Sequence, residues 1–122
     1  MKQFLFGLLL IGLLLAACNG HADQPPNPKQ LYDHGQVIYV EYCAECHQMD
    51  GMGWSTLYPR LAGNPIVTLH DPSPIIETVT YGQGSMTAFG ERITSDDIGA
   101  VLTYIRNSWG NSASAVSPRQ VH

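Results

Sequence analysis

The segment that most constrains the fold of this chain is Cys43-Ala44-Glu45-Cys46-His47, a Cys-x-x-Cys-His motif. This spacing is the attachment signal for c-type haem. Residues three apart lie on one face of a helix, so at a helix end both thiols can reach the vinyl groups on one side of a porphyrin. The adjacent histidine then lies under the iron. We predict one covalently bound haem c, with Cys43 and Cys46 as thioether attachment points and His47 as an axial iron ligand.

Two other uses of closely spaced cysteines fit the sequence less well. A structural zinc site needs a second pair of Cys or His ligands, but the chain has only three cysteines and its other histidines are scattered. A thioredoxin-like redox pair is expected between a strand and a helix, whereas this motif follows a helical pattern. The motif therefore favours haem attachment.

A second axial ligand is expected far downstream, because Met49 and Met52 lie too close to His47. Five residues extend to at most about 17 Å, which is too short to pass comfortably round the porphyrin edge. Met86 follows much later, in a glycine-rich segment whose backbone can approach a flat ligand closely. We predict Met86 as the second ligand, on the Met/His pairing of such haems. The alternatives are that it fills the core or that His70 is the ligand.

The first residues have the pattern of an export signal. Lys2 precedes an apolar run from Phe4 to Leu15, and small residues follow, as in a secretory signal peptide over residues 1–17. The run is shorter than the roughly 20 residues of a membrane span. Leu15-Ala16-Ala17-Cys18 resembles the lipobox of bacterial lipoproteins, which implies lipidation of Cys18. The alternative is ordinary cleavage nearby, with Cys18 an incidental thiol.

The rest of the chain divides into a tether, a helical head and a tail. Residues 18–30 are polar and rich in proline, which is typical of a flexible linker. Residues 31–111 carry helical apolar patterns and no alternating strand pattern, so we expect a small all-α domain of about four helices with long loops. Residues 112–122 form a polar tail that we expect to be loose.

Helix boundaries follow from apolar spacing and from capping residues. The expected helices run from Leu31 to about Cys43, shortly after Pro65, from a cap at Ser73 to Gly82, and from a capping box at Thr94 to Gly110. The long loop of residues 49–64 is more readily explained if it wraps a bulky ligand.

The charge balance limits the class of partner. After removal of residues 1–17, five basic residues face ten acidic ones, a net charge of −5 before any cofactor. This acidity argues against nucleic acid or an anionic membrane surface as the partner. It permits attraction to a basic patch on another protein.

Several separate motifs resemble the class I cytochromes c, small electron carriers with one haem. Gly35 and Tyr39 match the glycine and aromatic residue of the family's first helix, and Val101 and Tyr104 match the pair on the last helix that meets them. The resemblance implies an all-α fold of about four helices wrapped around one covalently bound haem. Residues 101–111 are especially similar to cytochrome c modules that accompany bacterial periplasmic dehydrogenases and oxidases.

The resemblance also implies roles for loop residues. The carbonyl of Pro59 would accept a hydrogen bond from His47 Nδ1, which fixes the ring. Arg60 is a candidate partner of a haem propionate, the alternative being a solvated surface arginine. The segment around Met86 resembles the family's methionine loop, although Thr87 stands where the family often has proline.

We therefore expect a periplasmic electron carrier, anchored by lipid at Cys18, that exchanges electrons with dehydrogenases, oxidases or reductases and transforms no substrate. One alternative is a fixed haem subunit of a periplasmic dehydrogenase or terminal oxidase. Another is an open-site haem peroxidase or gas sensor, which requires that Met86 does not bind the iron.

Overall fold

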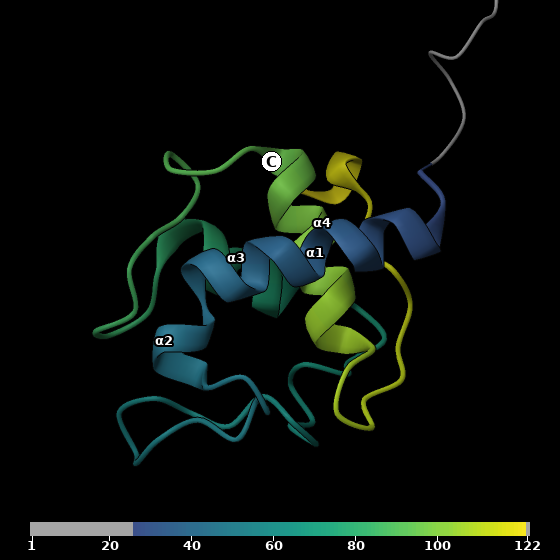
Figure 1. The fold of residues 1–122 in the computed structure, drawn as a ribbon. Helices are drawn as coiled ribbons and strands as arrows, with labels where there is room; N and C mark the ends of the chain where they lie inside the picture. Colours follow the sequence, from purple (N-terminus) through teal and green to yellow (C-terminus); the bar gives the residue numbers. More distant parts are fainter. Residues whose placement is uncertain (1–25, 122) are drawn as a thin grey trace, which may run out of the picture.

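The computed structural model describes residues 26–121. The predicted signal peptide, Cys18 and most of the tether lie outside the described residues, as does His122. The described part holds α1 (Pro28–Tyr42), α2 (Ala44–His47), α3 (Ser73–Tyr81), α4 (Ser95–Arg106) and the 3₁₀ turn η1 (Pro118–Gln120). Within residues 26–121 there is no strand, only two isolated bridges in loops. The prediction of an all-α fold with about four helices and long loops is confirmed (Figure 1).

Helix α1 begins earlier than expected. Asn27 accepts a hydrogen bond from the backbone nitrogen of Lys29 at 2.9 Å, and Pro28 occupies the first helical position. Proline fits there because the first helical N–H has no partner in the helix. The last three residues of the predicted tether, 28–30, are therefore helical.

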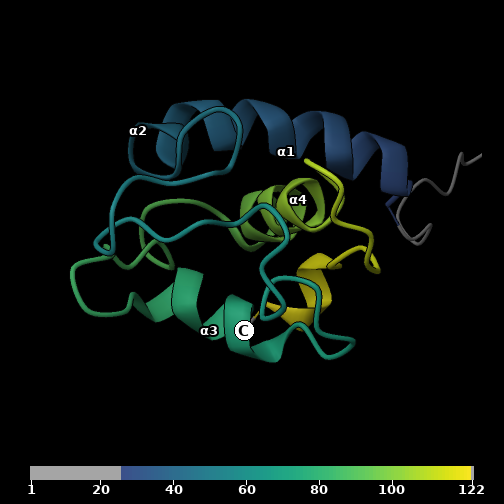
Figure 2. The same ribbon diagram turned by 90° about the horizontal axis from the view of Figure 1, so that it is seen from below.

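The molecule is built in three layers around α4. Figure 2 shows α1 on one side of α4 and α3 on the other. Gly35 permits the close crossing of α1 and α4, since a Cβ there would overlap the Ala100 carbonyl and lie 2.9 Å from Tyr104 Cβ. The rings of Tyr39 and Tyr104 lie 5.3 Å apart. The expected contact of α1 with Tyr104 is thus present, and Val101 belongs to the same buried cluster as Ile38 and Tyr39 of α1 and also borders a cavity.

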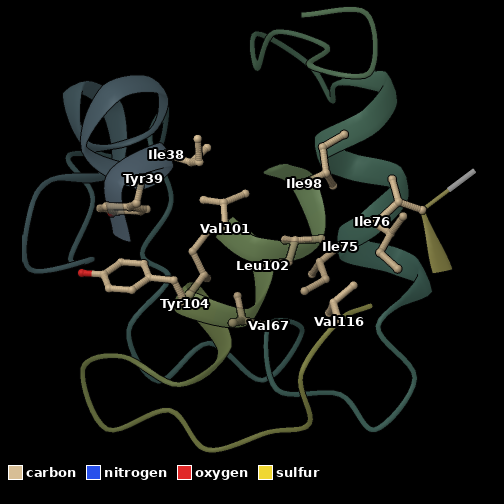
Figure 3. Close-up of a cluster of buried hydrophobic side chains, with 12 residues drawn as sticks. Ile38, Tyr39, Val67, Ile75, Ile76, Ile98, Val101, Leu102, Tyr104 and Val116 are labelled. Carbon is tan, nitrogen blue, oxygen red and sulfur yellow. The ribbon is translucent and has the colours of Figure 1, made fainter. Parts of the chain in front are cut away.

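Apolar side chains from all three layers converge in one core. Figure 3 shows this cluster, in which Leu102 of α4 lies close to side chains of α3. Its fully or nearly fully buried members are Ile38, Tyr39, Val67, Ile75, Ile76, Ile98, Val101, Leu102, Tyr104, Ile105, Val116 and Val121. Within residues 26–121 no helix is both long and apolar enough to cross a membrane.

The helix expected after Pro65 is absent, and that prediction is wrong. Residues 65–68 form turns, in which the side chain of Asn64 accepts a hydrogen bond from Ile66 N at 2.9 Å. The carbonyls of Val67 and Leu69 accept hydrogen bonds from Arg106. These carbonyls are therefore used in a tertiary contact rather than in a helical turn.

Helix α3 agrees with the prediction to within one residue, since its cap is Pro72 and Ser73 is its first residue. Helix α4 has the expected capping box between Thr94 and Asp97 but ends at Arg106, short of Gly110. Beyond it, Trp109 adopts a φ of +53°, which no helix accommodates.

The tail is not loose where it is described. Val116 and Val121 are buried, with exposed fractions of 0% and 4%. The backbone nitrogen of Val116 donates to the hydroxyl of Thr103 on α4 at 2.9 Å. The prediction of a loose tail is therefore wrong for residues 112–121. It rested on the polar composition of the tail and overlooked that two valines could be buried and that α4 could supply a hydrogen-bond acceptor.

Candidate functional site

The Cys-x-x-Cys-His motif forms the corner between α1 and α2. Cys43 caps α1, and its carbonyl accepts hydrogen bonds from the backbone nitrogens of Cys46 at 3.2 Å and His47 at 2.9 Å. This tight turn continues the helical spacing, which keeps residues three apart on one face. Both thiols are half-buried and free of disulfides.

The imidazole of His47 is held by one specific hydrogen bond. Its Nδ1 lies 2.8 Å from the carbonyl oxygen of Pro59, and the residue is only 8% exposed. A carbonyl can only accept, so Nδ1 carries the proton and the Nε2 lone pair is left to bind a metal. Such a carbonyl partner also fixes the ring orientation and raises the basicity of the ligand.

The loop that carries Pro59 is shaped by its own backbone. Gly51 and Gly53 adopt φ values of +66° and +65°, which favour glycine. The carbonyl of Gly51 accepts hydrogen bonds from Leu61 N at 2.8 Å and Ala62 N at 3.0 Å. The indole of Trp109 leaves no room for a Cβ at Gly51 and donates to Met49 O at 3.0 Å. The loop is therefore fixed against the end of the α4 segment.

Next to the motif lies a cavity with two lobes, of about 330 Å³ and 290 Å³. Cys43, His47, Pro59, Met86 and Phe89 border both lobes. One lobe, called the inner lobe here, is lined by aliphatic side chains from the 61–67 segment, α3 and α4, which are Leu61, Ile66, Val67, Ile75, Val79, Val101, Leu102 and Ile105. The other lobe, called the outer lobe, is bordered by the charged residues Glu41, Glu45 and Arg92.

Met86 reaches this cavity from the opposite chain segment. It is half-buried and ends a short turn in which Gln83 and Met86 exchange backbone hydrogen bonds of 2.9 Å and 3.3 Å. Gly82 and Gly84, with φ of +79° and +58°, allow that turn. The structure thus brings Met86 and His47 to one cavity.

The other methionines and histidines near the motif lie elsewhere. Met49 and Met52 are 57% and 46% exposed, and neither borders the cavity. His70, the rival ligand, is exposed and also absent from the cavity wall. Arg60 lies outside the wall as well, and its Nε donates to the carbonyl of Ala62 at 2.5 Å.

The donor set fits a covalently attached haem. Burial, with a smaller effect of Cys46, raises the pKa of the Cys43 thiol to about 12. A thiol that exchanges disulfides has a lowered pKa, so the redox-pair alternative loses support. No group of three His, Cys, Asp or Glu side chains within residues 26–121 could hold a metal ion by itself. An apolar lobe bordered by Cys43, His47 and Met86, joined to a lobe that Cys46 also borders, suits a flat apolar macrocycle with a central iron.

Some residues of this site escaped sequence reasoning. Phe89 borders both lobes and packs edge-on against Tyr42, with ring centroids 6.3 Å apart. The guanidinium of Arg92 lies over the Phe89 ring, 5.5 Å from its centroid. The sequence offered one signal for these two residues, their closeness to Met86. The spacing of three between Phe89 and Arg92 was no signal, because it is common on any helical turn.

Comparisons with known proteins agree with this geometry. The family described as "Cytochrome C oxidase, cbb3-type, subunit III" matches residues 30–105. The cytochrome c subunit of alcohol dehydrogenase (quinone) from Gluconacetobacter polyoxogenes is 32% identical over 65% of this chain and 19% of that protein. This chain therefore spans about a fifth of that relative's length.

Two further relatives resemble the chain over most of their own length. Cytochrome c-552 from Thermus thermophilus is 30% identical over 92% of this chain and 75% of its own length. Among solved structures, cytochrome c6C from Synechococcus has a TM-score of 0.50 and 28% identity, and covers 66% of this chain and 100% of that one.

Proposed function

Because this chain belongs to the cytochrome c family described as cytochrome c oxidase, cbb3-type, subunit III, and is an electron carrier with one covalent haem c, we propose that His47 and Met86 are the two axial ligands of its iron. With both axial positions filled, no substrate or gas has a free site on the metal. The chain would then shuttle single electrons between redox proteins rather than transform a substrate.

The observation that carries this proposal is the shared cavity of His47 and Met86. The two side chains come from segments far apart in the sequence, yet both border each lobe. Sulfur ligation is favoured over imidazole ligation because His70 is exposed and away from the cavity. When bound, the haem supplies a one-electron couple whose potential is raised by a thioether ligand.

The chain's own residues contribute orientation and exclusion of water. Pro59 holds the proton of His47 on Nδ1 through the 2.8 Å hydrogen bond. The aliphatic wall of the inner lobe keeps water away from the iron site, which lowers the local dielectric constant. Arg60 is proposed as a propionate partner, since its Nε is used by Ala62 and its terminal nitrogens remain further donors.

Replacement of Met86 tests the ligand assignment. The ferric wild type should show the absorption band of methionine-to-iron charge transfer, and Met86→Ala should lose it. Met52→Ala and His70→Ala are matched controls that should keep the band, because both side chains lie away from the cavity. A wild type without the band would instead support the open-site alternative of a peroxidase or gas sensor.

We further propose that the head is tethered to a membrane by lipid at Cys18, on the periplasmic side. Helix α1 has 15 residues and is about 22 Å long at 1.5 Å per residue. Its first residue, which continues the tether, and the haem motif at its last turn therefore lie at opposite ends. Such an arrangement lets the cavity mouth face a partner while the N-terminus stays near the lipid.

Membrane association of Cys18→Ser tests the anchor. The variant should be released in soluble form with its haem intact, and unchanged membrane binding would contradict the lipid anchor.

A dehydrogenase partner is proposed from the relatives that are dehydrogenase cytochrome subunits. A fixed subunit would co-purify with a dehydrogenase or oxidase at constant stoichiometry, whereas a free carrier would not.

A further inference from the structure

Arg106, the last residue of α4, is the largest fully buried side chain of the described residues, with an exposed fraction of 0%. Its Nη1 donates to the carbonyls of Val67 and Leu69, each at 2.9 Å. Its Nε and Nη2 donate to the carbonyl and the hydroxyl of Ser114, at 2.9 Å and 3.1 Å. Four of the five N–H groups of the guanidinium thus have partners.

All four acceptors are neutral. Within residues 26–121, the ion pairs are Lys29 with Asp33 and His34 with Asp97, and Arg106 pairs with no carboxylate. Burial lowers the pKa of Arg106, yet a guanidinium remains protonated in proteins. The interior therefore holds one positive charge that no neighbouring negative charge balances.

Burying an unbalanced charge costs desolvation free energy, which other ways of joining two segments avoid. Even a paired buried charge is often replaced by apolar side chains without loss of stability. Methionine would fill similar space at the end of α4 at lower desolvation cost. Stability of the core by itself therefore does not account for a charged residue at this position.

The charge lies directly behind the wall of the haem cavity. Val67, whose carbonyl accepts from Arg106, borders the inner lobe with its side chain, and so does Ile105, the neighbour of Arg106 in α4. Figure 3 shows Val67 in the same cluster as Tyr104 and Leu102 of α4. Arg106 thus hydrogen-bonds to the backbone of one cavity wall. Its unit charge belongs to a residue that neighbours the wall but does not itself border the cavity.

We propose that Arg106 is a positioning residue with an electrostatic role: it ties the 67–69 segment and the tail to α4, and its buried charge favours the reduced state of the haem site. The ferrous site carries one positive charge fewer than the ferric site, so a nearby cation stabilises it relative to the ferric form. Salt screens a buried charge much less than an exposed one. The inference rests on haem binding in this cavity and is independent of which residue is the sixth ligand.

The first test changes charge at the Arg106 site without changing shape. Ser114→Asp places a carboxylate beside Nη2, and Ser114→Asn is the neutral control of equal size. Ser114 is exposed, so the two variants are compared at low ionic strength, where screening is weak. There we expect the equilibrium constant for reduction to be about tenfold lower in Ser114→Asp than in Ser114→Asn, a difference of about 59 mV for one electron. Equal potentials in the two variants would overturn the electrostatic role.

The second test removes the charge itself. Arg106→Met should lower the reduction potential. Arg106→Lys keeps the charge but loses the fork of donors, so its reduction potential should stay close to that of the wild type. Both should lower the free energy of unfolding, because both lose carbonyl contacts. Lys29→Met removes an exposed cation and should leave the potential unchanged at physiological salt.

The two readouts separate a structural role from an electrostatic one. If both Arg106 variants lose stability but keep the wild-type reduction potential, Arg106 serves only to tie the 67–69 segment and the tail to α4. That result would refute the proposal. If Arg106→Met does not fold, the Ser114 pair decides. The ferric charge-transfer band, measured in each variant, checks that the Met86 ligation is intact, so a failure of the ligand proposal is seen separately.

Discussion

The Nδ1 atom of His47 lies 2.8 Å from the carbonyl oxygen of Pro59, twelve residues further along the chain. That distance is held by the loop between them rather than by a helix. Within this loop, Gly53 contacts His47 directly, because the backbone nitrogen of Gly53 donates to His47 O at 2.9 Å. A Cβ at Gly53 would lie 2.8 Å from the Pro59 carbonyl oxygen.

Gly53→Ala should therefore disturb the hydrogen bond of His47, the proposed iron ligand. We expect a loss of about 3 kcal/mol in unfolding free energy, from overpacking and from a left-handed φ for alanine. A weaker hydrogen bond makes the imidazole a poorer donor to ferric iron, so the reduction potential should rise. Gly110→Ala is the matched control, since Gly110 has a φ of +85° but no atom near its Cβ. It should cost about 1 kcal/mol and leave the potential unchanged; a potential shift in both variants would contradict the assignment.

Gly35→Ala tests the crossing of α1 and α4. Alanine is normally the better helix former by about 1 kcal/mol, but here its Cβ would overlap the Ala100 carbonyl. Overpacking should win and lower the unfolding free energy by about 2–3 kcal/mol, measured by denaturant titration. Gln36→Ala, at the neighbouring exposed position, should be nearly neutral. An unchanged Gly35→Ala would show that the helices separate without cost.

Thr103→Val tests whether the tail is an integral part of the fold. The hydroxyl of Thr103 donates to Gly99 O at 2.8 Å and accepts from Val116 N at 2.9 Å. Valine fills the same space and leaves the buried Val116 N–H without its partner, so we expect a loss of about 2 kcal/mol. Thr103→Ser keeps the hydroxyl and should lose less. Hydrogen exchange at Val116 should be faster in Thr103→Val alone.

The hydrogen-bonded pair of His34 and Asp97, with Nε2 and Oδ1 2.7 Å apart, gives a pH-dependent prediction. Burial would raise the pKa of Asp97, but hydrogen bonds from His34 and Thr94 outweigh it and hold the pKa below 3.8. A lowered carboxyl pKa stabilises the fold above the unfolded value, and this contribution is lost as pH falls through the folded pKa. Asp97→Ala should cost about 1 kcal/mol at pH 7.

That cost should shrink as the pH falls below 3.8, the ordinary value for the carboxyl. Asp96→Ala, in the same turn, serves as the control for the helix dipole alone and should cost less at pH 7. A cost for Asp97→Ala that is constant down to pH 2 would show that the effect comes from the side chain's packing rather than from its charge.

The sequence by itself determined the haem motif and the type of fold. Cys43, Cys46 and His47 lie within five residues of the chain, so local helical spacing was enough to predict their roles. Apolar periodicity likewise located α1 and α4, because an amphipathic helix records its buried face in its own sequence. The start and stop signals at Ser73 and Gly82 located α3. The match of family to residues 30–105 agrees with that assignment.

Only the tertiary structure decided the features that depend on distant partners. The turns after Pro65 and the packed tail could not be predicted, because both depend on acceptors and donors of α4, chiefly Arg106 and Thr103. Arg106 reads in the sequence as an ordinary cation at a helix end, where it would favour the dipole. Its burial is set by segments 37 and 8 residues away that meet around it, and local pattern carries no record of such contacts.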